Sequence, residues 1–561
     1  MTTGLRFLLA IIMMIGVLLV TNLLFPPVTP APSRAVDAET ATGPGLSPGV
    51  AEESPPRTTR PSPTEPAAVD TVPAQPYQSE QEVVVEGPLY RHVFTTRGAR
   101  LLSAELLDFR SFTRDGPVQL IPEGPTGALG LRLILASDTL DLRSVSFNPS
   151  DDHVTVGAGG PKELTFRHEG RGLVVEIRYS FSPDSYLVDV VGSIRGVDRA
   201  LLLIDLGSGL PFNEADEKSE ERALAYVGNH LQEGITSHPL REGVARPTVH
   251  EGPFLWAAFK SKYFVFALLP GVGEVGPEHF GGLLLWPEGE YRAPAAVTET
   301  IAGDGTFAYR AFIGPQDYEN LTALGSDLEE VNPYGWRLFR PVIRPFVVFF
   351  TVVLVFVHNT LNLAYGWVLV LFGITMRIVL WPFNQKAMRA QMRNMAVQPL
   401  LKEIQTKYKD NPERLQKEMM RLYKEHGFNP MAGCLPMLLP WPLLIALFFV
   451  FQNTIEFRGV PFLWIPDLSA PDPIFILPLF LGVSMFFLQW ISMRSMPEVN
   501  PQMKMMLWIM PIMMVFIFFN LAAGLNLYYS VFNMASVPQQ YLVAKERERL
   551  VAQGPVKPRA S

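Results

Sequence analysis

The sequence predicts a multi-domain membrane protein that combines an α-helical transmembrane bundle with a β-sandwich domain. Hydrophobic residues make up 48% of the 561 residues and charged residues 18%. The apolar residues gather in runs of about 20, the length that crosses a hydrocarbon core. Residues 173–194 alternate around a turn as paired strands do, and a basic stretch at 384–430 separates two apolar regions. Such a chain is expected to hold two or three units.

The first expected element is a membrane anchor at residues 1–25. Its apolar run exceeds the signal core of about 7–15 residues, and no small-x-small cleavage site directly follows it. We expect an uncleaved span with Arg6 on the cytoplasmic side. Residues 26–77 are rich in Pro, Ala, Thr, Ser and Glu, cannot bury enough apolar surface to order themselves, and are expected to form an extended linker.

Residues 78–330 are expected to form the β-sandwich domain. LVVEIRYSF at 173–181 and YLVDVVGSI at 186–194 predict a hairpin, and other strand candidates are EVVVEG, VTVGAG, PFLWAAFKSKYFVFALL and TFAYRAFIG. Two packed antiparallel sheets follow from this pattern. The nine histidines lack HExxH spacing and no GxSxG elbow occurs, so a scaffold or docking role is favoured over an enzyme.

Residues 331–363 are expected to form an interfacial amphipathic helix. Their strongest apolar run, 346–357, is shorter than the roughly 20 residues that a span needs. Arg337, Arg340 and Arg344 recur before it at helical spacing, which gives a basic stripe beside an apolar one. Counting this helix as a span would also place the basic stretch at 384–430 outside, against the positive-inside rule.

Residues 364–383 are expected to form the second span, and Arg377 lies inside it. An arginine at the centre of a membrane helix costs about 2.5–3.5 kcal/mol on insertion scales, so such a residue usually faces a bundle interior or a water-filled cavity. The alternative is that Arg377, one turn before Trp381, extends its guanidinium to the near headgroups. The residue alone leaves both interpretations open.

Residues 384–430 predict a cytoplasmic helical hairpin, because their excess of Lys and Arg places them inside. In the second arm, Asn411 is a candidate N-cap with Pro412 after it. In the first arm, Met388, Met392 and Met395 line one helical face. Unbranched methionines form an adaptable apolar surface for transient contact with many sequences. Packing of one arm on the other explains the same spacing equally well.

Residues 431–544 are expected to hold spans three to six, at 431–452, 474–493, 505–524 and 525–544, so that six spans leave both termini cytoplasmic. The tail at 545–561 is basic, although the whole chain has a net charge of −7. A basic tail beside a membrane is typical of contact with anionic lipid or ribosomal RNA, and specific DNA binding is not expected. The single cysteine, Cys434, excludes an intrachain disulfide.

Several motifs of the carboxyl half resemble, in order, those of the YidC membrane-protein insertase family. They are YGWRLF at 334–339, Arg377, NPMAGCLPMLLPWPLLIALFF at 429–449, DLSAPDP at 467–473, ILPLFLGVSMFFLQ at 476–489 and GLNLYYSVFN at 524–533. The resemblance implies five spans that form the insertase core, a periplasmic β-sandwich similar to sugar mutarotases, and an interfacial helix before the second span. It also implies a hydrophilic groove open to the cytoplasm, with a mobile hairpin that receives substrate.

Carried over by position, the groove charge of the family is Arg377, and the substrate-contacting positions are Trp441, Leu444, Tyr528 and Tyr529. Interfacial anchoring or helix packing is the plainer interpretation of these aromatic residues. Two positions that are polar in relatives are Gly373 and Pro440 here. The residues that could supply polarity instead are Thr375, Gln452, Asn520, Asn526 and Ser530.

The resemblance therefore implies a non-enzymatic insertase of the bacterial inner membrane, with residues 26–336 periplasmic and without cofactor or metal. The partners it implies are nascent membrane proteins, the Sec translocon, a translating ribosome and anionic lipids. Two alternatives remain at this point: a membrane-tethered carbohydrate-binding or mutarotase-like protein, and a solute transporter. Against a transporter, we find no inverted repeat and no second charge within a predicted span.

Overall fold

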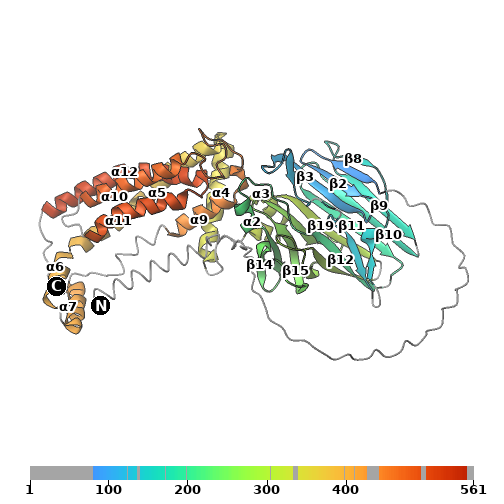
Figure 1. Cartoon of the computed structure of the whole chain (residues 1–561), viewed down its shortest axis with the longest axis horizontal. Coiled ribbons are helices and arrows are strands. Elements are labelled where there is room, and N and C mark those ends of the chain that lie inside the picture. The colour runs from blue at the N-terminus through green and yellow to red at the C-terminus, as the bar shows by residue number, and fades with distance from the viewer. Residues whose placement is uncertain are drawn as a thin grey trace, which may run out of the picture. The chain divides into compact units, whose positions relative to one another are not determined.

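The structure is a computed structural model, and it describes residues 80–552 apart from residues 123, 125, 136–138, 171, 198, 303–304, 333–338, 397, 410, 426–440 and 495–500. Residues 80–332 form a β-rich domain, called the β-domain below, and residues 339–552 are mainly helical (Figure 1). The predicted anchor at 1–25, the linker at 26–77 and the end of the tail lie outside the described residues.

The β-domain consists of two sheets, as predicted. The smaller sheet has the order β4-β3-β2-β1-β8, formed by Pro117–Gln119, Arg100–Arg110, Tyr90–Thr95, Glu82–Glu86 and His153–Thr155. The larger sheet has the order β6-β5-β12-β18-β17-β15-β16-β19-β11-β10-β9-β7, formed by Thr139–Asp141, Leu131–Ile134, Arg199–Gly207, Ala295–Ala302, Phe280–Leu285, Thr248–Lys260, Phe264–Pro270, Thr306–Pro315, Leu187–Arg195, Leu173–Phe181, Lys162–Gly170 and Asn148–Pro149. Two further strands, β13 at Ala225–His230 and β14 at Gly234–Pro239, join it beside β15.

The predicted hairpin at 173–194 is confirmed. Strands β10 and β11 pair antiparallel from Val174 opposite Arg195 to Phe181 opposite Val188. Along β10 the buried positions alternate with more exposed ones, which is the period of two that the sequence showed. The long apolar stretch at 253–269 is divided between β15 and β16, because the chain turns at residues 261–263.

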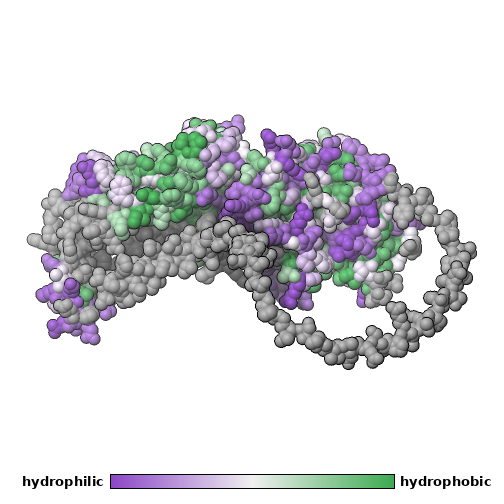
Figure 2. Space-filling model, viewed as in Figure 1, coloured by the Kyte–Doolittle hydropathy of each residue, from purple (hydrophilic) through white to green (hydrophobic). Residues whose placement is uncertain are grey.

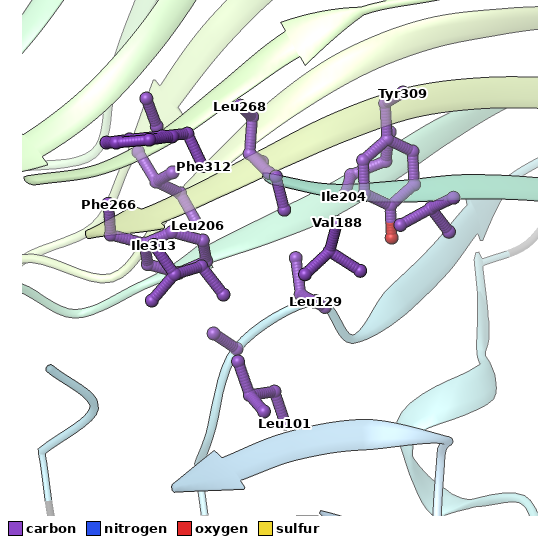
Figure 3. Close-up of a cluster of buried hydrophobic side chains, with 14 of the residues drawn as sticks. Leu101, Leu129, Val188, Ile204, Leu206, Phe266, Leu268, Tyr309, Phe312 and Ile313 are labelled. Atoms are coloured by element: carbon purple, nitrogen blue, oxygen red, sulfur yellow. The ribbon is translucent and has the colours of Figure 1, made fainter. Parts of the chain in front are cut away.

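The core of the β-domain lies between the two sheets (Figure 3). Leu101 of the smaller sheet points toward a layer of apolar side chains from the larger sheet that includes Val188, Ile204 and Leu268 (Figure 3). Each of these side chains is almost fully buried. Burial of each stabilises the fold by roughly 1.5–3 kcal/mol relative to exposure, so the two sheets are held as one unit.

Glu299 on β18 makes the stability of the β-domain depend on pH. Burial raises the pKa of its carboxyl from 4.5 to about 8, and its Oε2 atom has no hydrogen-bond partner among the described residues. The folded state therefore holds a proton that the unfolded state releases above pH 4.5, and stability falls as pH rises toward 8. We expect the free energy of unfolding of the wild type to fall by on the order of 3 kcal/mol between pH 5 and 8. In Glu299→Gln, this position should contribute little pH dependence.

Hydrogen exchange of the β18 and β19 amides in the full chain measures this effect. In the wild type, the exchange rate should rise with pH more steeply than the intrinsic chemical exchange rate does. In Glu299→Gln, it should rise only as steeply as the intrinsic rate. An equal pH dependence in both proteins would mean that another group is responsible.

The described helices have the following bounds: α2 Glu217–Ala223, α3 Tyr318–Leu324, α4 Arg340–Leu361, α5 Tyr365–Ala396, α6 Gln398–Lys407, α7 Pro412–Glu425, α9 Trp441–Asn453, α10 Ile476–Arg494, α11 Pro501–Phe518 and α12 Ala523–Ala552. By length and composition, the segments Arg340–Leu361, Tyr365–Gln385 and Ile476–Arg494 could cross a membrane, and Leu443–Asn453 and Leu507–Phe518 are shorter apolar helices. Hydrophobic surface gathers over the helical part and is sparser on the β-domain (Figure 2).

Helix α4 corrects the length argument made from the sequence. It has 22 residues, because the helix begins at Arg340 and includes Arg344 and Pro345 before the apolar run. Its length therefore does not exclude a span. In Figure 1, however, α4 lies across the direction shared by α5, α10 and α12, as an interfacial helix would. The interfacial assignment stays a prediction.

The predicted hairpin begins later than expected. Residues 384–396 continue α5 without a break, so the first arm starts as an extension of the second predicted span. Helices α6 and α7 then pack on each other. The predicted cap of α7 is present, because the amide of Arg414 donates to Asn411 Oδ1 at 3.1 Å.

The last two predicted spans are divided earlier than expected. The turn between α11 and α12 lies at residues 519–522, before the predicted boundary at 524, and α12 extends for 30 residues to Ala552. Its buried face carries the polar residues Asn526, Ser530 and Gln539. The count of six spans stays a prediction.

Candidate functional site

Arg377 lies between α5 and α12, in the interior of the bundle. Its side chain is 7% exposed, and its Nη2 atom donates to Gln539 Oε1. Gln539 in turn donates from Nε2 to the carbonyl of Trp381 at 3.2 Å. The Arg377 guanidinium also lies 5.3 Å from the centre of the Phe532 ring. Of the two interpretations left open by the sequence, the structure favours the interior one.

The face of α12 that receives Arg377 follows from helical spacing. Tyr528, Phe532 and Gln539 are four and eleven residues apart, which places them on one side of a helix. Gly373, one turn before Arg377, lets α5 approach this face, because a Cβ atom there would lie 3.2 Å from Val531 Cγ1 and 3.4 Å from the Tyr528 carbonyl oxygen. Gly373 therefore has a packing role between α5 and α12.

Arg377 makes no ion pair with a carboxylate among the described residues, and its Nε atom is buried without a hydrogen-bond partner there. A buried cation usually has a counter-ion, because the desolvation of an unpaired charge costs several kcal/mol. One amide oxygen and one aromatic ring compensate this cost only in part. The arrangement can therefore attract a carboxylate or other acceptor that enters the bundle.

Of the predicted substrate-contacting residues, Tyr528 and Tyr529 lie on α12, and Leu444 lies on α9. Tyr528 is buried, and its ring lies 5.3 Å from that of Tyr529. Leu444 is half-buried on α9, and Phe451 of the same helix lies 6.2 Å from Tyr528 between ring centres. The backbone of Trp441 begins α9, but its side chain lies outside the described residues, as do Pro440 and the side chains of Met388, Met392 and Met395.

The five predicted polar substitutes do not lie together. Asn526 and Ser530 are buried on α12, and Asn526 Nδ2 donates to the Phe518 carbonyl at 3.1 Å. Thr375 is exposed on the other side of α5 from Arg377. Gln452 and Asn520 instead line a small cavity between the helical ends and the β-domain. Asn526 and Ser530 are therefore the two that lie on α12, the helix whose Gln539 accepts the hydrogen bond from Arg377.

A second buried arginine joins the helical part to the β-domain. Arg458 follows α9 and the short helix η5, Ile455–Phe457, and its Nε atom lies 2.7 Å from Glu214 Oε1. Arg458 Nη2 donates to the carbonyl of Arg110 at 2.9 Å, and the rings of Phe112 and Phe264 lie 4.5 and 5.2 Å from its guanidinium. This contact connects two elements that are far apart in sequence.

Gln539, Arg458 and Glu214 were not predicted from the sequence. Gln539 could have been predicted from the sequence, because its spacing from Tyr528 places both residues on the face of α12 that Arg377 contacts. The eight residues after Arg458, GVPFLWIP, carry no charge. The sequence therefore shows Arg458 as a single cation beside an apolar segment. Its partner could not have been named, because 244 residues separate the two.

Two family models match the chain. The model described as 60Kd inner membrane protein matches residues 356–549, and the model described as YidC periplasmic domain matches residues 82–347. The membrane protein insertase YidC of Chlorobaculum tepidum is 32% identical over 493 residues, which cover 82% of this chain and 81% of the relative. The protein of the same name from Chlorobium limicola is 32% identical over 501 residues, with 83% of each chain covered.

Solved structures give weaker likenesses. A crystal structure titled active YidC insertase with the first transmembrane domain resolved has 17% identity and a TM-score of 0.34, and the match covers 83% of this chain and 93% of that one. A galactose mutarotase related enzyme from Lactobacillus acidophilus has 7% identity and a TM-score of 0.28, and covers 42% of this chain. At such TM-scores neither likeness bears on the function.

Proposed function

The chain belongs to the YidC family of membrane protein insertases, and from that premise we propose that Arg377 receives the acidic part of a client's polar segment between α5 and α12. The chain is a membrane protein insertase of the inner membrane, and its clients are nascent membrane proteins. The proposal concerns how the bundle lowers the barrier to their insertion.

The observation that carries the proposal is the buried Arg377 guanidinium without a carboxylate partner among the described residues. A polar client segment must cross an apolar layer in which each unsatisfied polar group costs several kcal/mol. A hydrated groove that opens to the cytoplasm and reaches Arg377 shortens that layer. The guanidinium has donors left after its bond to Gln539, and these can pair with a client carboxylate in a medium of low dielectric constant.

The free energy for insertion comes from the client and the membrane. The sequence contains no nucleotide-binding motif. Burial of a client's apolar stretch in lipid stabilises the inserted state by roughly 25 cal/mol per Å². In energised membranes the potential adds about 2.3 kcal/mol per charge per 100 mV. The bundle therefore facilitates insertion and does not pump.

In the orientation we propose, the chain has six spans and both termini are cytoplasmic, so that the β-domain is periplasmic. The basic residues of 384–430 and of the tail support this orientation through the positive-inside rule. The same residues are suited to contact with anionic lipid and with a translating ribosome. We also propose association with the Sec translocon, on family membership alone.

Photocrosslinking tests whether clients pass this face of the bundle. A photoreactive phenylalanine analogue at Tyr529 or Leu444 should crosslink to an arrested nascent membrane protein. The matched control is the same analogue at Val483, an exposed position on α10, and it should give background yield. Equal yields at all three positions would contradict a defined client path along this face of the bundle.

Deletion of the β-domain separates insertion from an activity that resides in that domain. If the bundle performs insertion, a chain without residues 82–330 should still insert a client in proteoliposomes at a substantial fraction of the wild-type yield. A membrane-tethered sugar-binding protein would instead lose its activity entirely. Complete loss of insertion in a stably folded deletion variant would contradict the role given to the bundle.

A further inference from the structure

A short turn between α9 and α10 presents apolar side chains to the surface. Phe462 and Ile465 pair through two backbone hydrogen bonds of 2.8 and 2.9 Å, and Leu463 and Trp464 form the tip between them. Leu463 is 70% exposed, although it is a leucine in a compact and well-bonded loop. Its φ of 55° is a left-handed value that leucine rarely adopts, so the loop holds this side chain outward at a conformational cost.

The charged residues at both ends of this segment have partners within the protein. The segment 459–466, called the apolar turn below, contains no charged residue. Arg458 before it is committed to Glu214, and Asp467 after it accepts from the amide and hydroxyl of Ser469 at 2.8 Å each. An exposed loop in water normally shows the opposite pattern, with polar side chains outward.

The apolar turn is continuous with other exposed apolar surfaces. The ring of Phe462 lies 5.4 Å from that of Trp367, an exposed residue in the first turn of α5. The indole of Trp464 donates to Asp472 Oδ1 at 3.3 Å, and this carboxylate also receives the amide of Ile474. A row of exposed apolar residues then runs into α10, formed by Ile474, Phe475, Ile476, Leu479, Phe480 and Val483.

We propose that the apolar turn is inserted among the lipid acyl chains of the outer leaflet. The turn lies at the amino end of α5 and of α10, which is the outer end in the orientation proposed above, so this inference rests on that orientation. Tryptophan at such a position suits the boundary between acyl chains and headgroups. Because Arg458 ties the adjacent residue to the β-domain, the turn also fixes the height of that domain above the membrane.

Depth measurements with spin labels test the proposal on the full chain. Cys434 is replaced by alanine, a nitroxide is attached at Leu463→Cys or, separately, at Trp464→Cys, and the protein is reconstituted in phosphatidylethanolamine and phosphatidylglycerol vesicles. Both labels should be several-fold more accessible to oxygen than to a water-soluble nickel complex. A label at Phe516→Cys, 65% exposed on α11, is the reference for lipid, and one at Val249→Cys, 64% exposed on the β-domain, is the reference for water.

If both tip positions are as accessible to the nickel complex as Val249→Cys, the turn is not inserted in lipid and the proposal is wrong. That result would not affect the proposed orientation of the bundle. An impermeant reductant, applied in turn to right-side-out and inverted vesicles, identifies the leaflet. Faster reduction from the side that carries the carboxyl terminus would overturn the outer-leaflet assignment together with the proposed orientation. The two failures are thus distinguishable.

Discussion

Replacement of Arg377 by alanine is expected to reduce the insertion of clients with acidic external segments about tenfold to a hundredfold in proteoliposomes. A hydrogen bond to a charged group is worth about 1.5–3 kcal/mol, and each 1.4 kcal/mol corresponds to about a factor of ten. Arg377→Lys should retain most of the activity, because an ammonium keeps the charge, although it loses the planar fork of donors. The effect should be small for clients whose external segment has been neutralised.

The matched control is Arg494→Ala, which removes an arginine at the carboxyl end of α10 that stacks on Trp490 and is exposed. Insertion by this variant should equal that of the wild type for every client. Because Arg377→Ala leaves the Gln539 amide without its partner, thermal unfolding in detergent must show that the variant still folds. Equal insertion of acidic clients by wild type, Arg377→Ala and Arg377→Lys would remove the charge from the mechanism.

The architecture could be predicted from the sequence where local pattern decides it. Alternation over residues 173–194 determines which faces of β10 and β11 are buried, so the hairpin was predictable. The start of α7 was predictable because Asn411 and Pro412 act locally. The start of α4 was harder to predict. Hydropathy alone places the start of the apolar run at Phe346, whereas the helix begins at Arg340 and includes Pro345.

For the candidate site, the sequence could predict only which residues share a face of one helix. That Arg377 is buried agrees with its place in an apolar helix, but its contact with Gln539 depends on how α5 and α12 pack over a distance of 162 residues. Thr375 could have been set aside from the sequence, because two residues along a helix is a rotation of about 200°. The contact between Glu214 and Arg458 depends on how the β-domain meets the helical part, which no local pattern encodes.

The pair formed by Arg458 and Glu214 is expected to show a large coupling energy. Their side chains are 4% and 6% exposed, and burial raises the pKa of the Glu214 carboxyl while the Arg458 guanidinium opposes that rise. Removal of one partner of a buried ion pair costs about 3–5 kcal/mol, because the other charge stays desolvated. Arg458→Met and Glu214→Leu should each destabilise the contact by about that amount.

The double variant should be less destabilised than the sum of the single variants, because it contains no unpaired charge. Hydrogen exchange of residues 208–216 and 453–458 in the full chain measures the opening of this contact. The control cycle uses Arg344 and Glu330, whose side chains are 41% and 16% exposed at a separation of 2.6 Å; more exposed pairs are worth about 0.2–1 kcal/mol. Additive effects in the Arg458–Glu214 cycle would mean that the two charges do not stabilise each other.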